Sequence, residues 1–441
     1  MLTQEQIKSL TEKALKYSTF PECTVSVNET EQAYVRFANN GVTTSALTLD
    51  RAVTIVSTKD GRSGVARTSL LGDDALRAAV SNSEKLAAIS PPNPENVPPL
   101  GPQKYPVIDN FDDATAAARG PQMVPHVKNI IDRAAKDKLV SAGFFSRTLG
   151  VEGFATKTGN SGFSRNVDCD LTTTVRTAAG DSSGWAGQNA VRIAEINGGE
   201  LGDRAAAKCA RWKSPVRLDP GKYKVVLEPT AVADLLGNVR FAFDARGAEE
   251  GRTFFSKKGG GTRLGEKIFP DYVTLRSDPF DKRFPSNPWS NGLLPAQART
   301  WIDKGVVRNL AYNRYWALKT KQEPVEFPGS LILEGGESSL ADLIKATDRG
   351  LLVTRFWYLR VLNPQTLQLT GLTRDGLFLI ENGEVTKPVV NFRFNESPFR
   401  LLTSIQKMGR AVRAPRSEQG SVVVPPVLAA DFNFTSISDA V

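Results

Sequence analysis

The chain has 441 residues, of which 40% are hydrophobic and 8% aromatic, so it has the apolar side chains of a folded protein and is not disordered. One compact core rarely serves this length, so we expect two or three domains. No segment approaches the roughly 20 apolar residues of a membrane-spanning helix, and a net charge of +9 is weak evidence for an acidic partner.

Residues 1–90 are predicted to form an N-terminal α/β domain. The segment begins with Ile7, Leu10 and Ala14 at helical spacing among polar residues, which indicates an amphipathic helix and not a secretory signal. Two long runs of partly alternating β-branched and aromatic residues follow. The turn sequences ANNG and KDGRSG between them favour antiparallel hairpins. A helix is expected at residues 70–88.

Residues 91–106 contain seven prolines and are predicted to be an extended connector, because proline fixes φ and lacks a hydrogen-bond donor. Residues 107–215 then form a central α+β region. We expect helices at residues 123–138 and 193–213, separated by a Gly-, Ser- and Thr-rich meander of short strands.

Residues 216–441 are predicted to form a strand-rich C-terminal domain with a few helices. Short apolar runs alternate with turns, and Asn-Gly at residues 382–383 marks a hairpin. The fold class is therefore α+β, with an N-terminal α/β region built on a mixed or antiparallel sheet and a strand-rich C-terminal domain.

A helix is expected at residues 228–247, with Pro229 in its first turn and Gly247 at its end. Its apolar residues recur at the spacing of one helical face, which predicts burial against the core. These residues are Val232, Leu235, Leu236, Val239 and Phe243.

Cysteine and histidine are scarce in this sequence. The cysteines, Cys23, Cys169 and Cys209, are odd in number and far apart, so we expect no disulfide framework and a reducing, cytoplasmic location. His126 is the only histidine, which argues against the usual serine triad. We expect no cofactor.

Two basic stretches raise the question of nucleic acid. Residues 355–360, RFWYLR, are predicted to be a strand whose two arginines lie on opposite faces, so no basic aromatic face forms. Lys407, Arg410 and Arg413 recur every three residues and would form a basic stripe on a helix, for which solvent exposure is the default interpretation. We do not expect a nucleic-acid partner.

Several long blocks agree with one family. LGEKIFPDYVTLRSDP at 264–279, GLLVTRFWYLRVLNPQT at 350–366 and GLFLIENGE at 376–384 resemble the TldD/PmbA family, also described as modulators of DNA gyrase. YVRFANNG and DGRSGVARTS resemble its N-terminal blocks. The resemblance implies a metallopeptidase-related fold across nearly the whole chain.

The resemblance also identifies what this sequence lacks. The catalytic TldD type is a zinc peptidase with HExxxH on a helix and a cysteine near the C-terminus, because imidazole and thiolate bind zinc and glutamate serves as a general base. Here Gly237, Asn238 and Ala242 stand at the HExxxH positions, and the cysteine position falls near Gln419. We interpret these four as vestigial zinc-site positions, with no catalytic residue and no metal.

The chain therefore resembles the metal-free TldE/PmbA type. That resemblance implies a non-catalytic subunit that pairs with a TldD-like zinc peptidase as a heterodimer, or with itself, around a cavity for unfolded or extended peptides. Candidate cavity residues are Arg355, Trp357 and Asn363. Two alternatives stay open. The chain could be an independent hydrolase or peptidase with an unrecognised site, or a basic nucleic-acid-binding or gyrase-associated protein.

Overall fold

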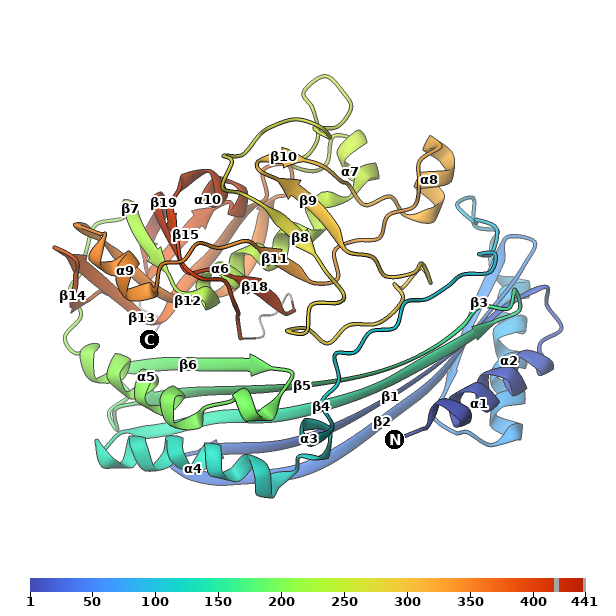
Figure 1. Ribbon diagram of the computed structural model, residues 1–441, viewed down its shortest axis with the longest axis horizontal. Helices are drawn as coiled ribbons and strands as arrows, with labels where there is room; N and C mark the ends of the chain where they lie inside the picture. The colour runs from blue at the N-terminus through green and yellow to red at the C-terminus, as the bar shows by residue number, and fades with distance from the viewer. Residues whose placement is uncertain (416–419, 439–441) are drawn as a thin grey trace.

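The computed structural model describes residues 1–415 and 420–438, and its fold is α+β as predicted (Figure 1). A long, curved antiparallel sheet from the N-terminal half lies beneath the strand-rich C-terminal half. In the order β3–β2–β1–β4–β5–β6, the first sheet contains β1 (Glu22–Ala38), β2 (Gly41–Lys59), β3 (Arg62–Thr68), β4 (Val140–Thr156), β5 (Ser161–Arg176) and β6 (Ser183–Ala190).

Two pairs of helices cover the outer face of this sheet (Figure 1). Val25 and Val27 of β1 are buried with α1 and α2, and Val35 and Phe37, on the same face of the strand, are buried with α4. The helices of this half are α1 (Gln4–Tyr17), α2 (Asp73–Ile89), α3 (Asp113–Ala117), α4 (Gly120–Lys136), the short 3₁₀ helix η1 (Ile193–Glu195) and α5 (Gly198–Arg211).

The second sheet closes on itself. Its pairings run β12–β7–β19–β15–β13 and return from β13 to β12, while β14 and β16 extend it at β13 and β19. Closure leaves no free edge along this ring of strands. The strands are β7 (Gly221–Leu227), β12 (Arg349–Asn363), β13 (Gln368–Glu381), β14 (Glu384–Pro388), β15 (Phe392–Glu396), β16 (Ile405–Met408) and β19 (Val427–Ile437).

A third sheet packs beside this ring, and α6 shares the core with both. Its order is β10–β9–β8–β11–β18–β17: β8 (Leu275–Ser277), β9 (Arg299–Asp303), β10 (Val306–Val307), β11 (Leu331–Leu333), β17 (Val412–Arg413) and β18 (Val422–Val424). The helices are α6 (Pro229–Leu236), the 3₁₀ helix η2 (Gly237–Phe243), α7 (Ala245–Glu249), α8 (Arg314–Thr320), α9 (Leu340–Lys345) and α10 (Pro398–Ser404).

The proline-rich connector does not separate two sheets. Residues 1–90 and 107–215, expected as an N-terminal domain and a central region, contribute strands to the same sheet through the β1–β4 pairing. The predicted meander consists of three antiparallel strands in succession, but the first two are long, with 17 and 16 residues, and only the third, with 8, is short. The boundary near residue 216 stays a prediction. Within the described part of the chain, no helix is long and apolar enough to cross a membrane.

Candidate functional site

The segment expected to be one helix at residues 228–247 is broken. Pro229 begins α6 as predicted, but the α-helix ends at Leu236 and continues as the 3₁₀ helix η2. The chain then turns at Asp244 into α7, so Gly247 lies inside a helix and does not end one. The predicted apolar stripe is buried in the core, and this burial holds the segment in place across the change of helix type.

The positions interpreted as vestigial face the core. Gly237, Asn238 and Ala242 are all buried on η2. The Asn238 side chain donates from Nδ2 to the carbonyl oxygens of Asp234 at 3.0 Å and Leu235 at 3.4 Å. Its amide therefore serves as a donor to carbonyl groups at the junction of α6 and η2. Gln419 lies outside the described residues.

These residues do not fit a zinc ion. Glycine and alanine have no ligand atom, and a neutral amide is a poor zinc ligand. His126 lies on α4 in the other half of the molecule, with its ring edge-on to Phe145. Across residues 1–415 and 420–438, no three histidine, cysteine, aspartate or glutamate side chains are grouped so as to hold a metal.

A large cavity lies beside η2, on the side away from these buried positions. Its volume is about 980 Å³, which is within the usual size of ligand pockets. The walls come from the connector, η2, the loops around β8 and β9, the loop before β11, and the start of β18. Five prolines and five aromatic residues line it: Pro279, Pro285, Pro295, Pro324, Pro328, Phe241, Phe284, Trp289, Trp301 and Phe327.

Arg240 is the residue of η2 that most affects the chemistry of this cavity. Its Nε and Nη2 atoms are buried and have no hydrogen-bond partner among the described residues. Burial lowers the pKa of its guanidinium, and no carboxylate within residues 1–415 and 420–438 counteracts that shift. Each buried donor left unpaired costs about 1–3 kcal/mol, and more when charged. Two N–H groups of this cation therefore lack an acceptor among the described residues at the cavity wall.

Sequence reasoning missed Arg240. One signal was available, because residues 229–243 contain only two charged side chains, Asp234 and Arg240, in an otherwise apolar run. Asp234 accepts the backbone N–H of Phe356 at 2.9 Å, so it joins α6 to β12. No comparable partner exists for the arginine within the described part of the chain.

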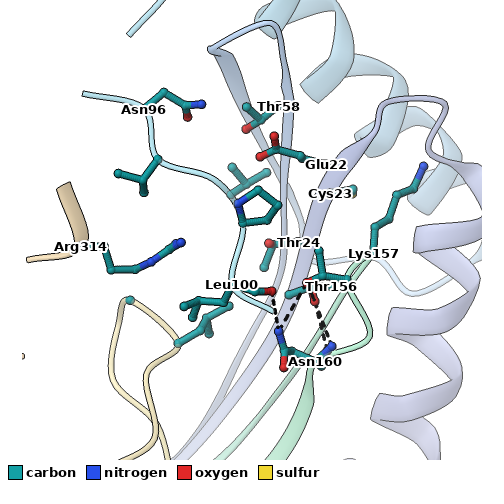
Figure 2. A pocket seen from close by; sticks show the side chains of 16 residues that line it. Glu22, Cys23, Thr24, Thr58, Asn96, Leu100, Thr156, Lys157, Asn160 and Arg314 are labelled. Atoms are coloured by element: carbon teal, nitrogen blue, oxygen red, sulfur yellow. Dashed lines mark hydrogen bonds between the residues drawn. The ribbon is translucent and has the colours of Figure 1, made fainter. Parts of the chain in front are cut away.

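A second, smaller cavity of about 230 Å³ lies where the connector crosses the end of the first sheet (Figure 2). Asn160 secures the connector there, since its Nδ2 donates to the carbonyls of Leu100 at 3.1 Å and Gly101 at 3.0 Å. Arg314, on the opposite wall, donates to the carbonyl of Pro98. No buried polar side-chain atom of this cavity lacks a partner within the described ranges, so its polar groups serve the packing of the connector.

The three predicted peptide-cavity residues do not line either cavity. Arg355 is held at the contact between the two halves, with Nη1 3.9 Å from Asp375 and its guanidinium over the Trp185 ring. Trp357 is 38% exposed on the outside of the β12–β13 hairpin. Asn363 accepts the backbone N–H of Gln365 at 2.9 Å, which shapes the hairpin turn.

The strand RFWYLR and the basic stripe differ from expectation. Tyr358 has φ of +58°, and the β12–β13 register shifts between Trp357 and Arg360, so strict alternation fails there. Lys407 lies on β16, Arg413 on β17 and Arg410 between them, so these residues are not on a helix and do not form the basic stripe that a helix would give. The Arg413 side chain is 6% exposed and donates to Asp168 of β5 at 2.5 Å.

The architecture and the unusual α6–η2 segment agree with one known family. The sequence model of the PmbA/TldA metallopeptidase C-terminal domain matches residues 220–436, which include the closed sheet, η2 and most of the large cavity. Through this domain the chain belongs to the TldD/PmbA family. Among curated proteins, none shows significant sequence similarity to it.

Solved structures related to the TldD/PmbA family share the whole fold. TldE from Thermococcus kodakarensis superposes with a TM-score of 0.86 at 18% identity, over 98% of this chain and 100% of that one. A proposed modulator of a DNA gyrase from Thermotoga maritima gives 0.83 at 20% identity, over 98% and 100% of the two chains. A similarly described protein from Bacteroides thetaiotaomicron gives 0.85 at 19% identity, over 99% and 100%.

Proposed function

We propose that this chain is a non-catalytic subunit of a TldD/TldE-type peptidase, which supports a zinc-bearing partner acting on unfolded or extended peptides. The supporting observation is the chemistry of η2. At the positions of HExxxH, Gly237 and Ala242 offer no ligand atom, and Asn238 uses its amide to bond backbone carbonyls. None of them can act as a general base.

A role as a paired subunit also accounts for the buried α6–η2 segment and for the cavity beside it. The α6–η2 segment stays buried in a well-packed core although it carries no metal chemistry, and a wide cavity lies beside it. A cavity of that size, with prolines and aromatic residues in its walls, suits an extended chain, which can be held through its backbone and through stacking on proline and aromatic surfaces. In this proposal the partner brings the zinc, and this chain brings part of the peptide-binding surface.

The test is a measurement of zinc content and peptide hydrolysis, made on the chain alone and on its mixture with an HExxxH relative from the same organism. We expect the chain alone to be inert and the mixture to hydrolyse peptides faster than the relative alone. A mixture in which the relative carries Gln for the HExxxH glutamate is the control and should be inactive. Stoichiometric zinc and hydrolysis by this chain alone would contradict the proposal.

Size measurement separates the two modes of pairing. Light scattering of the chain alone, of the relative and of their mixture gives the mass of each species. A mixed species of one copy each supports a heterodimer, and a stable dimer of this chain that excludes the relative supports a homodimer. A mixture that stays as two separate species and shows no gain in hydrolysis would remove the subunit proposal.

A further inference from the structure

The arginine side chains that line the large cavity differ in whether their N–H groups have hydrogen-bond acceptors. Two arginines and two glutamates line it: Arg240, Arg299, Glu323 and Glu326. Arg299 is satisfied, because its Nη1 donates to Asn309 at 3.2 Å and its Nη2 donates to Gln297 at 3.1 Å. Arg240 has two buried N–H groups with no acceptor within the described ranges. The two arginines of this cavity therefore differ in their hydrogen-bond partners.

The surroundings of Arg240 leave room for an acceptor. Gly420 flanks its guanidinium, and a Cβ placed on that glycine would lie in van der Waals contact with it, 3.4 Å from Nη2. Gly420 also has a φ of +96°, a conformation that side chains other than glycine rarely adopt. Phe241, next to Arg240 on η2, is 60% exposed and offers its ring to the same space.

We propose that this cavity binds a carboxylate group of an extended peptide, with the Nε and Nη2 groups of Arg240 as its anchor. A guanidinium presents parallel N–H groups that match the two oxygens of a carboxylate. The prolines and aromatic residues of the walls then pack along the peptide that carries the carboxylate. The inference rests on the proposed function for its peptide ligand, and it names the chemical group that the cavity selects.

A carboxylate fits this cavity better than a phosphate. Glu323 and Glu326 on the walls oppose any anion, and they oppose a dianion about twice as strongly as a monoanion. Prolines and aromatic rings stand among polar side chains on the walls, so the ligand must replace water with packing as well as with charge. The carboxylate can belong to the C-terminus of the peptide or to an aspartate or glutamate side chain. Both sources offer the same two oxygens to Arg240.

The test is calorimetric titration of the full chain with an acetylated hexapeptide of alanine, phenylalanine and proline in three forms. One form has a free C-terminal carboxylate, the second a C-terminal amide, and the third a C-terminal amide preceded by glutamate. We expect a carboxylate-bearing form to bind about 10- to 100-fold more tightly than the plain amide, as for a charge-assisted hydrogen bond. Whichever carboxylate form binds more tightly identifies the source.

Two variants assign the effect to Arg240. Arg240→Gln should reduce the ratio of carboxylate to amide affinity to about one, and Arg240→Lys should keep part of it, since a lysine keeps the charge but not the paired donors. Arg299→Gln is the matched control, because it removes the other arginine of the same cavity, and it should keep most of the ratio. Thermal melts check that each variant folds. If Arg240→Gln does not fold, the ratio of carboxylate to amide affinity in Arg240→Lys, compared with that of the wild type, still tests the inference.

Three results would overturn the inference: equal affinity of the wild-type chain for acid and amide peptides, an unchanged ratio in Arg240→Gln, or inorganic phosphate that displaces the acid peptide at lower concentration than acetate does. These titrations use the chain without a partner. An acid preference without any gain in hydrolysis by a zinc-bearing relative would remove the proposed function and leave the carboxylate site. A gain in hydrolysis without a preference for the acid peptide would remove the carboxylate site and leave the proposed function.

Discussion

Lys208 on α5 and Glu228 at the end of β7 form an ion pair that joins the N-terminal sheet to the closed C-terminal sheet, with 2.7 Å between Nζ and Oε1. Their side chains are 14% and 4% exposed. Burial lowers the pKa of Lys208, and the Glu228 charge partly restores it. Thr354 of β12 also donates to Glu228, at 3.3 Å. The pair thus lies where α5, β7 and β12 meet.

Glu228→Gln should destabilise the chain by about 3–5 kcal/mol, because it leaves the Lys208 charge buried without its partner. Urea unfolding gives the free energy of unfolding. Glu12→Gln is the control, since Glu12 pairs with Lys8 at 3.9 Å on an exposed helix face and its loss should change stability by less than about 0.5 kcal/mol. Equal effects of the two substitutions would show that the buried pair does not hold the halves together.

Gly198→Ala should destabilise the contact between α4 and α5. A Cβ on Gly198 would lie 2.2 Å from the carbonyl oxygen of His126, and backbone atoms cannot move aside easily. Overpacking of this kind costs about 1–3 kcal/mol. Gly199→Ala, the neighbouring control, meets only the Asn197 side chain at 3.4 Å and should be neutral or slightly stabilising. Thermal melts compare the two, and equal melting temperatures would contradict the close contact.

His126 should make stability fall as the pH drops below about 6.5. Burial lowers the pKa of its imidazole from the ordinary value of 6.5, so the unfolded chain binds the proton more readily than the folded chain. Protons therefore favour unfolding, and the contribution is present above pH 6.5 and is lost between 6.5 and the lower folded value. Unfolding of the wild type and His126→Gln at pH 5.5 to 7.5 tests this. A slope in that range that is the same in the variant would assign it to other groups.

The three cysteine thiols should resist alkylation in the folded chain. Cys23, Cys169 and Cys209 are free and buried, and burial raises the pKa of each. Little reactive thiolate exists at pH 8, and access is blocked. A thiol reagent should find no reactive site in the native chain and three in denaturant. Ser9→Cys, at an exposed position of α1, is the positive control and should react at once. Fast reaction of a native cysteine would show local opening.

Local signals in the sequence predicted the hairpin turns and the long helices α1, α2, α4 and α5. Asn39 and Asn40 have φ of 51° and 57°, and Asn382 has φ of 52°, so the predicted hairpin turns formed where residues that tolerate positive φ stand. The first helix was also predicted, because Ile7, Leu10 and Ala14 recur at helical spacing within a few residues of one another. The residues that line the large cavity were not predicted, since no local pattern indicates which loops surround a cavity.

The sequence by itself determined the absence of an HExxxH motif, the hairpin turns and the apolar stripe of residues 232–243, because each depends on residue type or on neighbours along the chain. Only the tertiary structure decided that residues 1–90 and 107–215 share one sheet and that β12 and β13 close the second sheet. It also decided that Nε and Nη2 of Arg240 have no acceptor within residues 1–415 and 420–438. Strand pairing and charge pairing depend on groups distant in sequence, whose proximity results from packing of the whole core.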